Sequence, residues 1–228
     1  MAITKNLVCL ANSRKNGGRC VAGIGVIDGF RSWIRPVGDR PSREVNAGER
    51  QYQDGMEPQI LDVVAVPLVG PLPRGFQREN WLLDSTECWR KVAQIRWDQL
   101  RTLEEHPSSL WINGHQSSAA VNDRVPVEQG YALKDSLKLI RVNRVTMEVR
   151  SAHPASLDPT PTVRARFQYE DSEYVLRVTD PVREVKFRTK GRGEYDLGEC
   201  FLTVSLGEAY QGYFYKLVAA VIERAEVE

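Results

Sequence analysis

The sequence has no long apolar run and no recognisable leader. No stretch approaches the roughly 20 consecutive apolar residues that cross a bilayer. The short apolar run at the N-terminus turns basic at Arg14 and Lys15, which is the wrong order for a secretory signal. We therefore expect a cytoplasmic protein with no membrane segment.

Residues that carry common chemistries are few and scattered. The four cysteines and three histidines form no CxxC pair and no cluster at metal-ligand spacing, which argues against a zinc site. We expect reduced, buried thiols, with a redox pair of Cys9 and Cys20 across a hairpin as the alternative. No Walker A, GxSxG or HExxH motif occurs. We expect no metal, no cofactor and no catalytic residue. An enzyme that uses Asp180 or Glu208 with Cys9 or Lys216 ranks last.

Length and charge are those of a folded protein with one basic region. A chain of 228 residues with 42% hydrophobic and 27% charged residues can form one large domain or two small ones. The net charge is +1, yet the first fifty residues alone carry +5 and the remainder −4. A positive segment on a near-neutral body suits a localised anion site, although chance also produces such segments.

Alternating apolar runs separated by turn formers predict a mainly β protein. Residues 5–12 and 19–27 flank a turn-rich linker, and 31–37 follows the turn at Asp28-Gly29, which predicts a three-stranded meander. A second set of strands is predicted from Ser136 onward, including residues 183–189 after Pro181. Between the two sets, Asp84 and Glu87 fit a capping box. These patterns predict an N-terminal domain over 1–133 with a helical insert at about 84–112, and a C-terminal domain over 134–228.

The tip of the first hairpin is the leading candidate for binding an anion. Cationic and hydroxyl side chains gather on a turn that contains glycine, where they can meet phosphate oxygens together with backbone N–H groups. These residues are Ser13, Arg14, Lys15 and Arg19. The alternative is a solvated turn whose charges only aid solubility.

Trp33 and Arg35 form a second candidate because they are two residues apart in a strand and share a face. On an exposed face, the indole could stack a base and the guanidinium could hold its phosphate. The alternatives are a core tryptophan and an arginine paired with a nearby carboxylate.

Two secondary candidates lie further along the chain. Asn80 and Trp81 precede the expected insert, where tryptophans are stacking platforms if exposed and packing residues otherwise. Asp180 follows Arg177 near a strand end and could orient a ligand. Its position before a proline is equally typical of a turn.

Five segments in chain order are similar to the bacterial family of dual OB-containing domain proteins. They are CLANSRKNGGRCVAG (9–23), WIRPV (33–37), ENWLLD (79–84), VTDP (178–181) and SLGEAYQGYFYKLVAAVI (205–222). The resemblance implies two OB-like antiparallel barrels and a nucleic-acid or nucleotide ligand, in antiviral defence or genome maintenance. It assigns no catalytic residue.

These observations favour a non-enzymatic module that binds single-stranded nucleic acid or a nucleotide. Arg14, Lys15 and Arg19 would contact phosphates, and Trp33 would stack a base beside Arg35. The alternative is an adaptor that docks on a larger effector protein such as a helicase or nuclease, which the near-zero net charge also fits.

Overall fold

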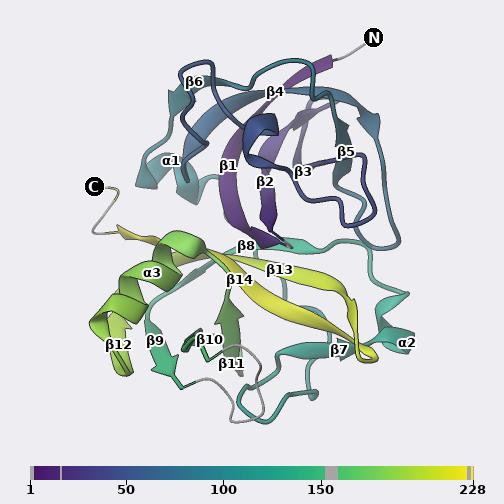
Figure 1. Cartoon of the computed structure of the whole chain (residues 1–228). Helices are drawn as coiled ribbons and strands as arrows, with labels where there is room; N and C mark the ends of the chain where they lie inside the picture. The colour runs from purple at the N-terminus through teal and green to yellow at the C-terminus, as the bar shows by residue number, and fades with distance from the viewer. Residues whose placement is uncertain (1–2, 16, 152–158, 225–226, 228) are drawn as a thin grey trace. The chain divides into compact units, whose positions relative to one another are not determined.

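The computed structural model describes residues 3–15, 17–151, 159–224 and 227 of the chain. The chain divides into two compact units, each built around one sheet (Figure 1). The first unit comprises Met1–Leu103 with Lys134–Ser136, and the second comprises Glu104–Leu133 with Leu137–Glu228. Among the described residues, no helix is both long and apolar enough to cross a membrane.

Strand pairing in the first unit runs in a ring. The strands are β1 (Ile3–Lys15), β2 (Gly18–Ile27), β3 (Phe30–Val37), β4 (Asp62–Pro71), β5 (Asn80–Leu83) and β6 (Arg90–Gln94). Their order is β1-β2-β3-β5-β4, and β4 also pairs with β1, so the path returns to its start. The β3–β5 pair is parallel and the other pairs are antiparallel, with β6 added to β4. This arrangement is an OB-like barrel.

The second unit repeats this path. Its strands are β7 (Arg124–Pro126), β8 (Leu137–Val142), β9 (Val145–Arg150), β10 (Thr162–Tyr169), β11 (Ser172–Val178), β12 (Gly193–Leu197), β13 (Cys200–Tyr210) and β14 (Tyr213–Glu223). Only two residues separate β8 from β9. If these are one bent strand, the order β9-β10-β11-β14-β13-β8 closes in the same way as in the first unit. The one parallel pair, β11–β14, falls at the same point in the path as β3–β5.

Both barrels are filled by alternate side chains of their strands. In β10, Val163, Ala165 and Phe167 are buried, whereas the residues between them are more exposed. This is the two-residue period of a strand with one face in the core. The expectation of a mainly β protein with two OB-like barrels is therefore confirmed.

The helices differ from the expected ones. Most of the expected insert is not helical, because residues 90–94 form β6 and only α1 (Trp97–Arg101) is an α-helix there. Residues 183–189 were expected to be a strand but lie in helix α3 (Pro181–Lys190). Asp180 caps α3 by accepting hydrogen bonds from the backbone N–H groups of Val182 and Arg183, and proline is favoured at the first helical position. Two shorter elements, η1 (Ala47–Glu49) and α2 (Val127–Gly130), lie in loops.

Residues 104–133 group with the second unit, whereas the sequence placed them in the first. Leu110 is buried in the core of the second barrel, and the Glu105 N–H donates to the Leu139 carbonyl at 2.8 Å. Lys216 is buried too, and its ammonium donates to the Ile112 carbonyl and to Asn113 Oδ1, both at 2.8 Å. A buried cation on β14 thus fastens this segment to the barrel.

Lys216 should make stability depend on pH. Burial lowers the pKa of its ammonium to about 7 in the folded protein, whereas an unfolded lysine releases its proton near pH 10. Between these values the unfolded chain binds more protons, so the free energy of unfolding should rise with pH, by about 3–5 kcal/mol in total. Urea denaturation of the parent and of Lys216→Met from pH 6.5 to 9.5 would measure this. We expect the rise in the parent and a flatter profile in the variant, and parallel profiles would contradict the account.

Candidate nucleic-acid interface

The register of the first hairpin separates the residues expected to act together. Arg14 lies directly opposite Arg19 across the β1–β2 pair. Residues directly opposite share a face of the sheet, and neighbours along a strand alternate between faces. Arg14 and Arg19 are therefore on one face, and Ser13 and Lys15 are on the other. The tip presents two pairs of side chains rather than one cluster.

Only part of this tip is exposed. Arg14 is exposed, Lys15 and Arg19 are half-buried, and Ser13 is buried with its hydroxyl donating to the Cys20 carbonyl at 3.4 Å. The backbone of Arg19 exchanges two hydrogen bonds with Val45, of 3.0 and 2.9 Å.

A carboxylate lies close to the cations of the tip. A hydrogen bond from Ser42 is the main cause that lowers the pKa of Glu44, and the positive charge of Lys15 adds to it. Arg14 is the most exposed of the three cations at the tip.

Arg35 is not on an exposed face, so the expectation that it lies available beside Trp33 is wrong. Only 5% of Arg35 is exposed. Its Nη2 contacts Glu79 Oε1 at 2.9 Å and Ser136 Oγ at 2.8 Å, and its Nη1 lies 3.4 Å from Asn80 Oδ1. Strand alternation placed Arg35 correctly on the outer face. Residues distant in sequence cover it there, which a local pattern cannot reveal.

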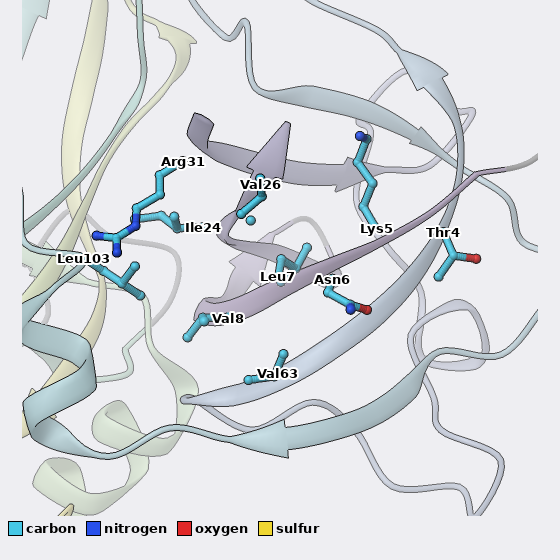
Figure 2. Close-up of a pocket in the computed structure, with 11 residues that line it drawn as sticks. Thr4, Lys5, Asn6, Leu7, Val8, Ile24, Val26, Arg31, Val63 and Leu103 are labelled. Carbon is cyan, nitrogen blue, oxygen red and sulfur yellow. The ribbon is translucent and has the colours of Figure 1, made fainter. Parts of the chain in front are cut away.

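Trp33 is half-buried on the outer face of β3, directly opposite Ile24. Ile24 is six residues along β2 from Gly18, so the indole lies about 20 Å from the hairpin tip. Ile24, but not Trp33, lines a groove of 460 Å³ in the first unit (Figure 2). The apolar lining of this groove is Val8, Ile24, Val26, Val63 and Leu103, and its polar lining includes Lys5, Asn6 and Arg31. Arg31 donates to the Thr102 carbonyl.

Of the secondary candidates, only Arg177 is exposed. Asn80 is buried beside Arg35, and Trp81 is buried with the Lys5 ammonium 4.9 Å from its ring centroid. Asp180 is buried at the start of α3, and burial raises the pKa of its carboxyl above the usual value. Asp180 is thus the N-cap of a helix rather than a turn residue, and Trp81 packs in the core of the first unit.

The two cysteines considered as a redox pair are not brought together. Cys20 lies opposite Ser13 and Cys9 opposite Gly23, so the two thiols do not face each other, and none of the four cysteines is in a disulfide. Lys216 holds residues 112–113, as described above. Within the described part of the chain, no three potential metal ligands cluster.

The second unit has an aromatic surface that the sequence analysis did not identify. Phe214 and Lys216 of β14 are buried, so Tyr213 and Tyr215 point outward and are half-buried. Tyr210 at the end of β13 is 63% exposed, and its ring centroid lies 6.3 Å from that of Tyr215. On β7, the Arg124 guanidinium carbon lies 3.9 Å from the Tyr213 ring centroid.

A row of cations continues this surface across the neighbouring strands. Arg164 of β10 lies directly opposite Arg177 of β11, and Arg177 is in register with Leu217 of β14. Leu217 is two residues from Tyr215 on the same face, which is about 7 Å along the strand. Arg150 at the end of β9 lies on the other side of Arg164, and its positive charge reaches that guanidinium.

Together these side chains form the arginine–tyrosine surface, which comprises Arg124, Arg150, Arg164, Arg177, Tyr210, Tyr213 and Tyr215. It can attract anions and stack planar rings. The sequence contains two patterns that could have indicated this surface. Arginines stand two residues apart in TVRARFQY (162–169), and tyrosines stand two residues apart in YFY (213–215). Neither segment shows that β10, β11, β14 and β7 bring these residues to one face.

The comparisons with known proteins identify a family and one distant structure. The model of the dual OB-containing domain matches residues 5–221. Among solved structures, the chain is similar to one described as the crystal structure of the tetrameric p202 HIN2, with 8% identity and a TM-score of 0.31 over 96% of this chain and 91% of that one. That similarity is too low to support an inference. The search of curated proteins found no match.

Replacing Arg35 should damage the fold. Arg35→Ala leaves Glu79 buried without its cation, which typically costs about 3–5 kcal/mol. The exposed Arg14→Ala is the matched control and should change stability by about 0.5 kcal/mol or less. Urea denaturation of both variants measures the difference. Equal stabilities would show that the Arg35–Glu79 pair is not structural.

Proposed function

We propose that this chain, which belongs to the dual OB-containing domain family, is a non-enzymatic module that binds single-stranded nucleic acid or a nucleotide. The observation that carries the proposal is the arginine–tyrosine surface, where cations and half-exposed aromatic rings share one sheet face. The setting that the family resemblance implies is antiviral defence or genome maintenance.

The chemistry of this surface suits a single strand. Bases stack on aromatic rings with little regard to sequence, because every base has a π-face, while cations follow the phosphates. Tyr215 and Arg177 lie on adjacent strands within about one nucleotide of each other. A base on Tyr215 would thus have its phosphate within reach of Arg177 and Arg164. Binding should be salt-dependent and weakly sequence-specific.

The first unit supplies a second contact in this proposal. Arg14, Lys15 and Arg19 contact phosphates and Trp33 stacks a base, with the 20 Å between them spanned by several nucleotides. Arg35 has no part in it, because its guanidinium is buried and paired.

A protein partner is the second candidate, and one observation in the first unit favours it. The groove of Figure 2 is largely apolar, and Val26 in its wall and Phe30 at the start of β3 are 62% and 76% exposed. Exposed apolar patches of this kind mark interaction sites. This candidate corresponds to the adaptor alternative and does not use the arginine–tyrosine surface.

Removing a stacking ring should weaken binding. Tyr213→Ala removes a ring at the centre of the arginine–tyrosine surface, and loss of base stacking costs about 1–3 kcal/mol per base. Fluorescence anisotropy with a labelled 12-nucleotide single strand should therefore show affinity falling by roughly five- to a hundredfold. Tyr213→Phe keeps the ring and should bind almost as well as the parent. Equal affinities for Tyr213→Ala and the parent would remove Tyr213 from the site.

The contribution of the first unit is tested by changing Arg14, Lys15 and Arg19 together to Ala. Binding of the parent should fall roughly tenfold or more between low and physiological salt. If all three cations contact phosphates, the slope of log affinity against log salt should decrease by about 2 in the variant. The same oligonucleotide and anisotropy assay at five salt concentrations measures this. An unchanged slope would confine the site to the second unit.

A further inference from the structure

We infer that Arg164 forms a defined binding site for one oxyanion, a phosphate group of the bound ligand. The inference deepens the proposed function and rests on it for the identity of the ligand. It assigns a defined position to one phosphate, where the proposal alone requires only a diffuse positive surface.

The surroundings of Arg164 place a guanidinium among other cations. Arg177 lies directly opposite it on β11, and Arg150 contributes a second nearby positive charge. Burial is the main cause that lowers the pKa of Arg164. The charge of Asp123 raises it, those of Arg150 and Arg177 lower it, and that of Glu148 raises it. Like charges directly opposite each other destabilise an antiparallel pair. The sheet therefore maintains an arrangement that costs stability in the ligand-free protein.

The two carboxylates near Arg164 contact other residues, although Glu148 Oε2 has no hydrogen-bond donor among the described residues. Glu148 is directly opposite Arg164 on β9, yet its two oxygens contact Arg150 at 2.5 Å and Arg166 at 2.6 Å. The Asp123 carboxylate accepts from the Ser117 N–H at 2.7 Å and from the Ser117 hydroxyl at 2.6 Å.

Arg164 itself has one unused donor. Its Nε is buried and has no hydrogen-bond acceptor among the described residues. A buried donor without an acceptor costs stability unless a ligand satisfies it. The structure thus combines an unsatisfied donor with a second arginine directly opposite it.

A phosphate fits both requirements. Its oxygens accept two parallel hydrogen bonds from the fork of one guanidinium, and its charge offsets the repulsion from Arg150 and Arg177. The partial burial of Arg164 strengthens this contact relative to one made in water. A phosphate held at Arg164 would direct the attached nucleotide along β14 toward Tyr215 and Tyr213.

The test measures thermal unfolding with and without inorganic phosphate at constant ionic strength, balanced with sodium chloride. The melting temperature of the parent should rise saturably, by roughly 2–4 °C at phosphate several-fold above its dissociation constant. Arg164→Gln should lose this rise and, without phosphate, melt no lower than the parent because the like-charge contact is relieved. Arg192→Gln removes one exposed cation from the same unit and should behave as the parent.

Each remaining outcome also decides the inference. A full phosphate response in Arg164→Gln, or none in the parent, overturns it. If Arg164→Gln does not fold, Arg164→Lys is used instead, because it keeps the charge without the guanidinium fork. This variant should lose most of the response, and an unchanged response overturns the inference as well.

Oligonucleotide binding is measured separately. A parent that binds oligonucleotides but shows no phosphate response contradicts only this inference, whereas a phosphate response without oligonucleotide binding contradicts only the proposed function.

Discussion

Arg164 and Arg177 lie directly opposite each other on neighbouring strands of the second unit, and the functional account depends on this like-charged contact. A sheet with no ligand would be more stable with a carboxylate at either position. The carboxylate opposite Arg164 on the other neighbouring strand, Glu148, contacts Arg150 and Arg166. Local rules of stability are commonly broken where a ligand completes the structure. The three tyrosines on the same face favour a ligand that carries planar rings able to stack on them.

The two units use one path of strands but differ in what surrounds it. Between the third and fourth strands of the ring, the second unit inserts α3, whose Phe187 is buried in the core. The corresponding segment of the first unit is a loop with only the short η1. The second unit also gains β7 and the segment held by Lys216. Because β7 brings Arg124 against Tyr213, these additions help to build the arginine–tyrosine surface.

Much of the fold was predictable from local patterns, and the failures have physical causes. The first hairpin and the β10–β11 hairpin follow from alternation and turn residues, and both form as expected. The weak alternation of residues 183–189 suggested a strand. The cap at Asp180 and the proline after it start a helix there instead. Residues 90–94 follow a capping signal, yet pairing with β4 makes them a strand. The first failure came from a local capping signal that was interpreted as a turn, and the second from pairing between segments distant in sequence.

The candidate site was predictable only in part, because a site on a sheet depends on pairing between distant strands. Alternation correctly put Trp33 on an outer face, but it could not show that Glu79 and Ser136 cover Arg35.

The most direct test of where the nucleic acid binds is photocrosslinking of a single-stranded oligonucleotide to the full chain, with the crosslinked residues mapped by mass spectrometry. Crosslinks at Tyr210, Tyr213 or Tyr215 are the predicted result. Crosslinks confined to the groove of the first unit, or the absence of any crosslink under saturating conditions, would contradict the account.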